Sequence, residues 1–520
     1  MGGVFFITQQ KGSIMEFNEL EKIRAEKMKA LRERGIEPYP TRNAVSHEIA
    51  DVVAQFTEFE SSNPDTEFEP IFTIGGRIRS KRTMGKLAFC HIEDGSASMQ
   101  IMLRVNEIGK DQLDLFKEFF DLGDFIETSG TVIRSRTGEV TLVVSSFQML
   151  AKALSPLPAA KDEVKDGEVI SHSKLSDPET RYRERYADLA VNKEVREIFI
   201  QRYKTVRALQ KFLDGKGFIE VETPILQPIY GGAAAQPFET YHNQLHQNLY
   251  LRISFELYLK RLLVGGLDRV YEIGRDFRNE GVSFKHNPEF TQLEFYWAYA
   301  DYLKVMALTE EMVSQAAKEV LGSQIIQYDG HEIDLAPPWK RVELRQGIID
   351  AVGIDINDHA DAQSLFKAME SNGLKPKPGA TRGKLIDAII GDHLEPNFIQ
   401  PTFLYDYPRG ISPLAKNKPG DPSVVERFEG FVGGMELCNA FTELNDPLEQ
   451  EKRFLEMGRA YEDNDDERHP MDEDYLQAMS YGMPPNGGFG MGIDRLMMLF
   501  TNKRSIREVI LFPHLRTIEE

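Results

Sequence analysis

The spacing of apolar residues predicts one amphipathic helix near the start of the chain, between residues 16 and 34. Its apolar side chains recur at three- to five-residue steps, and Gly35 can end it. The other face mixes lysines and arginines with glutamates, which favours a solvated, salt-bridged surface and leaves contact with nucleic-acid phosphates as the alternative. The apolar positions are Phe17, Leu20, Ile23, Met28 and Leu31.

From about Phe68 to Leu150 the pattern changes to short runs of β-branched and aromatic residues. Turn signals at Asp94-Gly95 and Thr137-Gly138 separate some of these runs. Five short strands in about eighty residues indicate a small barrel, with an OB-fold as the leading candidate. The predicted strands contain residues 71–74, 87–92, 99–103, 125–128 and 140–144.

The rest of the chain divides into a linker and one large α/β region. A segment rich in Lys, Asp, Ser and Pro precedes that region, and residues 345–395 are rich in helix-forming patterns. We therefore expect four parts. They are an N-terminal extension with the amphipathic helix (1–64), the barrel (65–154), a linker (155–181) and the α/β domain with a helical insertion around 345–395 (182–520).

Composition and net charge indicate a globular protein that overall charge does not attract to nucleic acid. The chain has 520 residues, 41% of them hydrophobic, and a formal net charge of -20. Overall charge therefore cannot hold it to nucleic acid, and such binding would need local basic patches. Its two cysteines, Cys90 and Cys438, form no CxxC pair, so we expect neither a structural zinc site nor a disulfide framework. This cysteine usage fits a reducing compartment, so we expect a cytoplasmic location. No apolar stretch is long enough for a transmembrane helix.

Two segments carry candidate chemistry. Residues 275–281 form a charged loop between two strand-like runs, so Arg278 and Glu280 on one face of a hairpin could hold a phosphate and an adenine amino group. Alone, such a pair is more often a surface ion pair. The glycine run 487–492 enters an apolar helix with Arg495 in its first turn. Ile493 breaks the GxGxxG spacing, but small residues would let a flat ligand lie against the backbone.

Together these segments resemble motifs 2 and 3 of the class II aminoacyl-tRNA synthetases, and residues 217–224 resemble motif 1. The preceding barrel resembles the aspartyl, asparaginyl and lysyl group. The resemblance implies an α+β multidomain fold, an N-terminal OB-fold β-barrel followed by an antiparallel-sheet catalytic domain with flanking helices. Four further segments look like bacterial lysyl-tRNA synthetases: residues 231–238, 256–262, 286–291 and 439–447.

The resemblance implies a reaction and an ATP site. L-lysine and ATP would give lysyl-adenylate and pyrophosphate, and lysine would pass to the 3′ end of tRNA(Lys). Arg278 matches the arginine at the α-phosphate and the amino-acid carboxylate, and Arg495 the arginine at the γ-phosphate. Phe290 would stack on adenine, with Glu280 and His286 nearby.

The same resemblance implies Mg²⁺ held by Glu429 and Glu436, the first of which would also contact ATP, and a homodimer formed through motif 1. A lysine pocket should offer acids at both ends, because an unpaired charge in a dry site is expensive. The resemblance places Glu256 and the Gly232 backbone at the α-amino group. It places Glu443, Tyr296 and Glu294 at the ε-amino group and Asn439 near the carboxylate.

In the barrel, an aromatic side chain and an amide on adjacent strands suit the reading of single-stranded bases. A barrel phenylalanine is by itself more often a core residue. The family match makes this an anticodon-binding domain, with Lys81, Arg82, Phe89, Gln100 and Glu139 as its expected contacts.

The sequence departs from the family's usual residues at two positions, and three other functions are possible alternatives. Gln236 stands where the family usually has Arg, and Asn486 where Thr is usual. An aspartyl or asparaginyl enzyme is disfavoured by the acid pair Glu256 and Glu443. An enzyme that aminoacylates a protein is disfavoured by the N-terminal barrel. A non-catalytic tRNA-binding protein is disfavoured because both motif arginines are present.

Overall fold

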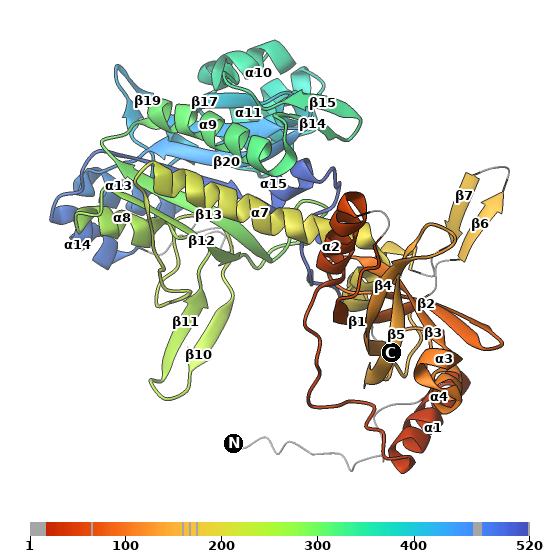
Figure 1. Ribbon diagram of the computed structural model, residues 1–520. Coiled ribbons are helices and arrows are strands. Elements are labelled where there is room, and N and C mark those ends of the chain that lie inside the picture. The colour runs from red at the N-terminus through yellow and green to blue at the C-terminus, as the bar shows by residue number, and fades with distance from the viewer. Residues whose placement is uncertain are drawn as a thin grey trace. The chain divides into compact units, whose positions relative to one another are not determined.

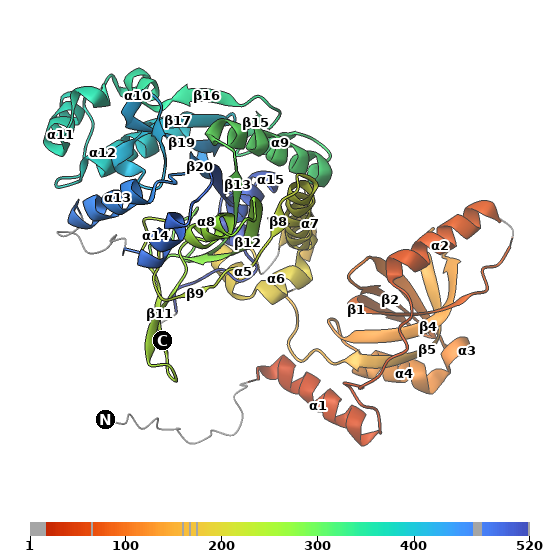
Figure 2. The same cartoon turned by 90° about the vertical axis from the view of Figure 1, so that its left-hand side faces the viewer.

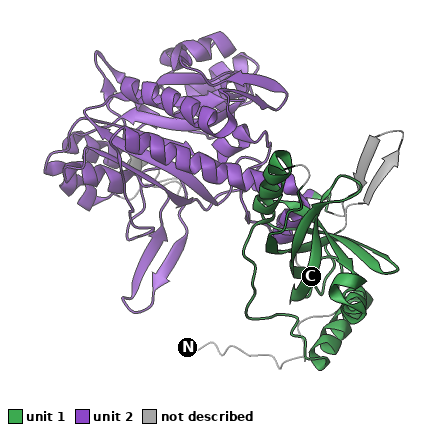
Figure 3. Cartoon of the chain, in the orientation of Figure 1, with its two compact units in different colours: residues 1–177 green, residues 178–520 purple. Residues whose placement is uncertain are grey.

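The structure, a computed structural model, describes residues 17–63, 66–158, 161–165, 168–172, 175–460 and 471–517. The chain contains two compact units, residues 1–177 and 178–520 (Figure 1, Figure 3). Residues 1–14 and parts of the predicted linker lie outside the described residues. None of the helices in the described ranges combines the length and apolar character that crossing a membrane requires.

Unit 1 contains the predicted barrel. Its five strands close in the order β1-β2-β3-β5-β4, with β3 and β5 parallel and the other pairs antiparallel. Two short helices that the sequence analysis did not predict, α3 (Val105–Ile108) and α4 (Lys110–Phe119), join β3 to β4. This topology confirms the OB-fold. The strands are β1 (Ile71–Met84), β2 (Leu87–Glu93), β3 (Ser98–Arg104), β4 (Phe125–Arg134) and β5 (Val140–Ala151).

Two N-terminal helices belong to unit 1. The predicted amphipathic helix is α1 (Glu19–Glu33), but its apolar stripe is wrong in its first half, where Leu20 and Ile23 are 47% and 51% exposed. Leu31 is buried as predicted, and Arg24, which was not expected to be, is also buried and donates to the carbonyl of Ala153. A second helix, α2 (Ile49–Ser62), was not predicted, and its apolar face packs into the barrel core.

The predicted linker holds β6 (Lys161–Lys165) and β7 (Glu168–His172), which pair with each other antiparallel. Unit 2 begins with α5 (Pro178–Arg183) and α6 (Arg185–Val191), followed by the long helix α7 (Lys193–Gly215).

A large, mainly antiparallel sheet organises unit 2 and confirms the predicted fold class. Its strands run in the order β16-β17-β19-β20-β21-β13-β12-β8, with β18 paired to β19. The pairs β8/β12 and β16/β17 are parallel. These strands are β8 (Ile219–Glu220), β12 (Arg269–Phe277), β13 (Glu289–Ala298), β16 (Lys340–Glu343), β17 (Thr402–Pro408), β18 (Asn417–Lys418), β19 (Asp421–Val432), β20 (Met435–Thr442) and β21 (Asn486–Gly492).

Smaller strands lie outside this sheet. A three-stranded sheet contains β9 (Leu226–Gln227), β10 (Glu239–His242) and β11 (Gln247–Leu251), and its β10–β11 hairpin projects from the unit (Figure 1). A separate hairpin contains β14 (Ile325–Tyr328) and β15 (His331–Asp334).

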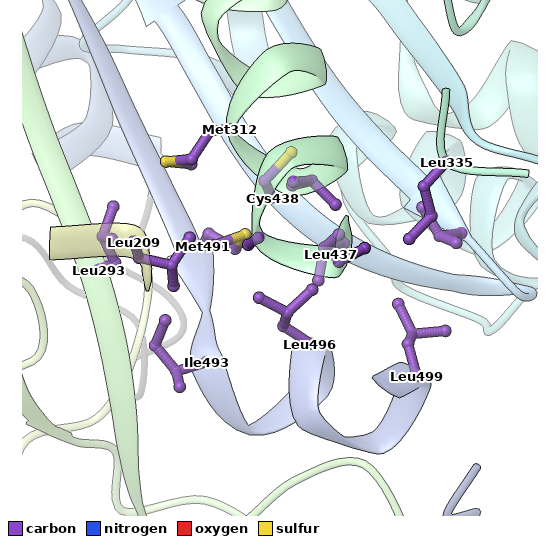
Figure 4. Packing of buried hydrophobic residues seen from close by; sticks show 14 of the residues in the cluster. Leu209, Leu293, Met312, Leu335, Leu437, Cys438, Met491, Ile493, Leu496 and Leu499 are labelled. Carbon is purple, nitrogen blue, oxygen red and sulfur yellow. The ribbon is translucent and has the colours of Figure 1, made fainter. Parts of the chain in front are cut away.

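The core of unit 2 lies between the sheet and its helices. Figure 4 shows Leu209 of α7, Leu293 of β13, Met312 of α9 (Tyr302–Leu321), Met491 of β21 and Leu496 of α15 (Ile493–Phe500) converging in one cluster. These side chains come from segments far apart in the sequence, so their packing fixes the site-bearing strands relative to one another. The remaining helices of this unit include α8 (Glu256–Val264), α13 (Pro447–Ala460), α14 (Glu473–Ser480) and α16 (Ile506–Val509).

The predicted helical insertion is present and has its own apolar cluster beside β17 and β19 (Figure 2). It contains α10 (Leu344–Val352), α11 (Ala362–Ser371), α12 (Arg382–Ile389) and the short turns Ile356–Asp358, Ile390–Leu394 and Glu395–Asn397.

A glycine in β4 tests the barrel packing. A methyl group at Gly130 would overlap the carbonyl oxygen of Val143 on β5. We expect Gly130→Ala to lower the free energy of unfolding of unit 1 by about 2 kcal/mol or more, because backbone atoms cannot move aside cheaply. Hydrogen–deuterium exchange of the barrel strands measures this separately from unit 2. Gly95→Ala, where nothing lies within 4 Å of the added methyl, is the matched control. Equal exchange in the two variants would contradict the packing.

Candidate active site

A cavity of about 910 Å³ lies in unit 2. Its wall combines the β12–β13 hairpin, the start of α8, the strands β20 and β21, and the first turn of α15. The structure therefore brings together side chains that the sequence places more than two hundred residues apart. The predicted site residues that line it are Gly232, Glu256, Arg278, Glu280, His286, Phe290, Glu294, Tyr296, Glu436, Asn439, Glu443 and Arg495. Among the predicted residues of this unit, Glu429 does not line it.

One end of the cavity is cationic. Arg278 follows β12, and its guanidinium carbon lies 5.2 Å from the centroid of the Phe290 ring on β13. Arg495 donates from Nη1 to the carbonyl of Glu436 at 2.6 Å and to its Oε2 at 3.1 Å. Two guanidinium groups thereby line one space, where they can neutralise an anionic ligand.

A buried ion pair fixes the direction of Arg495. Asp494 forms an ion pair with Arg202 at 2.7 Å and accepts a hydrogen bond from the backbone N–H of Thr291 at 2.7 Å. These contacts tie the start of α15 to α7 and β13. Because Asp494 and Arg495 are adjacent on the first turn, fixing the first leaves the second directed into the cavity.

His286 lies beside Arg495, with 3.2 Å between Nε2 of the imidazole and Nη2 of the arginine. Partial burial of its ring, and then the positive charges of Arg495 and Lys285, lower the pKa of His286 to about 4. The imidazole is therefore neutral near pH 7 and can accept a hydrogen bond from Arg495. The neutral imidazole therefore adds no second positive charge beside Arg495, and the arginine can bind an anionic group.

The other end of the cavity is acidic and closed. Glu256, Glu294 and Glu443 are almost fully buried there. Glu294 accepts hydrogen bonds from Ser254 Oγ at 2.8 Å, Gln292 Nε2 at 2.9 Å and the Tyr296 hydroxyl at 3.3 Å. Burial, and then the nearby charges of Asp276 and Glu256, raise the pKa of Glu294 well above its usual value. Glu294 is therefore protonated more readily than an exposed glutamate.

Glu443 has an unsatisfied oxygen. Its Oε1 is buried and has no hydrogen-bond partner among the described residues, whereas Oε2 lies 2.5 Å from the ammonium of Lys260. Burial raises the pKa of Glu443 to about 8, although Lys260 lowers it. A buried acceptor without a partner is rare in proteins and indicates a place for a donor on a ligand.

The glycine strand β21 makes room at this point. A methyl group at Gly488 would overlap Glu443 Oε1, and it would lie 2.5 Å from Cε1 of Tyr296. At Gly490 it would lie 2.8 Å from the side-chain nitrogen of Gln292. The sequence analysis expected small residues here to let a ligand lie against the backbone; in the structure the side chains of Glu443, Tyr296 and Gln292 approach these glycines.

Glu429 lies behind the cavity wall. Its carboxylate accepts from Arg427 Nη2 at 2.6 Å and from the Tyr407 hydroxyl at 2.8 Å, and Arg427 Nε also donates to Asn439 Oδ1 at 3.2 Å. Burial raises the pKa of Glu429 to about 7, opposed by Arg427 and reinforced by Glu436. The sequence analysis missed Arg427, although a cation two residues before Glu429 on one strand face was a usable signal.

The two unusual residues have structural contacts. The carbonyl of Gln236 accepts from the backbone N–H of Asn279 at 2.8 Å, beside Arg278. Asn486 is fully buried; its side chain donates to the carbonyl of Pro484 at 2.9 Å, and its own carbonyl accepts from the N–H of Glu443 at 2.8 Å. Both positions therefore hold segments that carry predicted site residues.

In unit 1, one face of the barrel gathers most of the predicted nucleic-acid contacts. Gln100 donates to Glu139 Oε2 at 2.8 Å, and His91, which the sequence analysis missed, lies 2.7 Å from Glu139 Oε1. Arg82 is paired with Phe89 across β1 and β2, next to the His91–Gln100 pair of β2 and β3. Glu139 is thereby held in position between two strands.

The side chain of Lys81 does not lie on this face, where the sequence analysis expected it. Its ammonium donates to the carbonyls of Phe116, Lys117 and Phe120 at the end of α4, at 3.0, 2.8 and 2.5 Å. Burial lowers the pKa of Lys81 to about 8. Successive residues of a strand point to opposite faces, so Lys81 and Arg82 cannot both reach the surface that holds Phe89.

Comparisons with known proteins agree with both units. Residues 177–516 match the family described as tRNA synthetases class II (D, K and N), the letters denoting aspartate, lysine and asparagine. Residues 72–150 match the family described as OB-fold nucleic acid binding domain.

Full-length relatives are also similar. The lysine–tRNA ligase of Pelotomaculum thermopropionicum is 49% identical over 515 residues, which cover 99% of this chain and 98% of the relative. That of Roseiflexus sp. is 50% identical, with 96% and 99% covered. That of Carboxydothermus hydrogenoformans is 48% identical, also with 96% and 99% covered.

Proposed function

The chain belongs to the class II tRNA synthetases of the aspartyl, lysyl and asparaginyl group, and we propose that it is a member specific for lysine. It activates L-lysine with ATP to lysyl-adenylate and transfers lysine to the 3′ end of tRNA(Lys). The observation that carries this specificity is the acidic end of the cavity, where Glu256 and Glu443 are buried and Glu443 Oε1 has no partner. An aspartate side chain would meet repulsion there.

The first step needs charge neutralisation rather than a base. A carboxylate oxygen of lysine attacks the α-phosphorus of ATP, so an O–P bond forms as the bond to pyrophosphate breaks, and no proton is transferred. Arg278 binds the α-phosphate and the lysine carboxylate, and Arg495 binds the γ-phosphate. Phe290 stacks on adenine and Glu280 accepts from its amino group. The work of the protein is therefore positioning and electrostatic stabilisation.

Magnesium fits the acids beside Arg495. Within the described ranges no group of three or more His, Cys, Asp or Glu is arranged to hold a metal. Mg²⁺, however, is commonly held by one or two carboxylates together with substrate phosphates. Glu436 lines the cavity and would hold the ion, whereas Glu429, the second expected ligand, does not line it and accepts hydrogen bonds from Arg427 and Tyr407. When bound, the ion would offset the negative charge of the triphosphate.

Lysine is held by charges at both ends. Its α-ammonium pairs with Glu256 near the Gly232 backbone, and its ε-ammonium pairs with Glu443 between Tyr296 and Glu294. Asn439 lies near the carboxylate. Burial makes each pair strong and makes a neutral or acidic side chain costly, because the pocket acids would stay unpaired.

The barrel of unit 1 binds the anticodon of the tRNA. Phe89 provides a stacking surface, and Gln100, Glu139 and Arg82 provide hydrogen bonds to base edges and phosphate. The bond from Gln100 and the contact with His91 fix the carboxylate of Glu139 in advance. Lys81 is not part of this surface, because its ammonium is used at the end of α4.

We also propose a homodimer, in the cytoplasm. The segment that resembles motif 1 (residues 217–224), the preceding helix α7 and the following residues 225–226 carry exposed apolar side chains, which a partner subunit would cover. Tyr203 of α7 is 66% exposed, and the others are Ile200, Ile219, Ile225 and Leu226.

The direct test of the function is ATP–pyrophosphate exchange with each of the twenty amino acids. We expect exchange with lysine and none with aspartate or asparagine. Exchange with aspartate instead would overturn the specificity, and no exchange with any amino acid would favour a non-catalytic tRNA-binding protein.

A pH profile tests the acidic pocket. Below about pH 8 a growing fraction of Glu443 carries a proton and cannot pair with an ammonium, because its pKa is about 8 in the free enzyme. We therefore expect KM for lysine to fall as pH rises from 6.5 to 8.5, while KM for ATP changes little. Exchange kinetics measure both, and a lysine KM independent of pH would contradict the role of Glu443.

Substitution of the same acid gives a second measurement. Glu443→Gln should lower kcat/KM for lysine about 100-fold or more, since a buried charge pair is lost, and should remove the pH dependence. Glu456→Gln is the matched control, because Glu456 lines the same cavity but pairs with Arg409 at 2.9 Å. Similar losses in the two variants would mean that general cavity charge, not Glu443, sets the affinity.

The proposed interface is tested separately. Tyr203→Asp should give a monomer by light scattering, because an unpaired charge would be buried between the subunits. Tyr481→Asp, at a 79% exposed tyrosine outside motif 1, should leave the dimer intact. A dimeric Tyr203→Asp protein would place the interface elsewhere.

A further inference from the structure

A lysine of the protein itself lies between the two acids of the pocket. Lys260 of α8 is fully buried, and its ammonium lies 2.9 Å from Glu256 Oε1 and 2.5 Å from Glu443 Oε2. Glu256 and Glu443 both line the cavity, whereas Lys260 lies behind its wall. One internal cation therefore contacts both carboxylates that the proposed function assigns to the substrate.

The local fold makes this arrangement. Glu256 and Lys260 are four residues apart on α8, which places them on one face of the helix. Glu443 follows the last residue of β20, 183 positions further along the chain. The ring of Tyr475 on α14 closes the remaining side, its centroid 5.8 Å from the ammonium. Lys260 is thus enclosed by a helix, a strand end and an aromatic ring.

The Lys260 ammonium contacts one carboxylate oxygen of each acid. Glu443 Oε2 contacts Lys260, while Oε1 is buried beside Gly488 with no partner among the described residues. Lys260 likewise contacts Glu256 at one oxygen, Oε1, at 2.9 Å. Fixing one oxygen of a carboxylate fixes the direction of the other.

We propose that Lys260 is a positioning residue for lysine recognition: it holds one oxygen of Glu256 and one of Glu443 and presents the second oxygen of each to an ammonium group of the substrate. This inference rests on the proposed function and deepens it. Lys260 does not touch the substrate. It fixes the distance between the two acids, and so the length of the diammonium ligand that fits.

Charge gives Lys260 a second effect on the same site. Burial disfavours its cation, but Glu256 and Glu443 raise the pKa of Lys260 well above its usual value, so it stays charged. Its charge in turn lowers the pKa of both acids against the effect of burial. The other titratable groups that face them are Glu294 and Tyr296 of β13, Tyr475 of α14 and Arg427 of β19.

Lys260→Met in the full-length enzyme tests the proposal. It keeps an unbranched side chain, shorter by the terminal nitrogen, and removes the charge, so both acids should be protonated over a wider pH range. We expect KM for lysine to rise about 100-fold, KM for ATP to change less than about threefold, and the acid limb of kcat/KM for lysine to move up by about one pH unit or more. A folded variant with the wild-type lysine KM and pH profile would overturn the proposal.

The neighbouring ion pair provides the control. Arg261, next on α8, forms an ion pair with Asp472 at 2.8 Å and does not line the cavity. Arg261→Met should reduce thermal stability without moving the pH profile or the lysine KM. If both variants moved the pH profile equally, Lys260 would be acting only through the packing of α8.

Lys260→Arg keeps the test valid if the methionine variant does not fold. It retains the charge but moves the donor atoms, so the pH profile should stay while KM for lysine rises about tenfold. An unchanged lysine KM would contradict positioning. Wild-type exchange that does not depend on lysine would instead refute the proposed function itself, so the two failures are distinguishable.

Discussion

The burial of charge at the closed end of the cavity is the constraint on which the rest of unit 2 depends. Glu256, Glu294 and Glu443 lie within one buried region, where like charges repel and solvent cannot separate them. The structure provides one internal cation, Lys260, and Ser254 and Gln292 donate hydrogen bonds to Glu294. Burial still raises the pKa of Glu294 well above its usual value. The balance remains incomplete at Glu443 Oε1, which has no hydrogen-bond partner among the described residues; in the function proposed above, a ligand ammonium completes it.

Positively charged groups, Arg278 and Arg495, lie at the other end of the same cavity. The large sheet sets the distance between the two ends. Antiparallel pairing of β12 with β13 places Arg278 and Phe290 at one end of the hairpin and Tyr296 nearer the other. The pairing of β13 with β21 brings Gly488 opposite Tyr296. Under the proposed function, lysine and ATP lie along this framework with the ammonium at one end and the polyphosphate at the other, and adenylate formation follows from that alignment.

The two units divide recognition by the physical nature of the target. Unit 2 recognises small charged molecules in a buried cavity, where a single unpaired charge is costly. The barrel of unit 1 offers Phe89, Gln100 and Glu139 on an open face, where stacking and hydrogen bonds suit extended bases. This division also explains how a chain with a net charge of -20 can bind tRNA, a polyanion, because the contact is confined to local surfaces.

The sequence by itself determined the elements whose signals are local. Alternating residues and turn signals predicted the five barrel strands and the hairpin that bears Arg278, and the glycine run predicted a backbone that other groups approach closely. Only the tertiary structure decided which side chains meet. Lys260 pairs with Glu443 from 183 residues away, Glu429 turns toward Arg427, and Lys81 caps α4. These outcomes depend on packing between distant segments, which local periodicity does not encode.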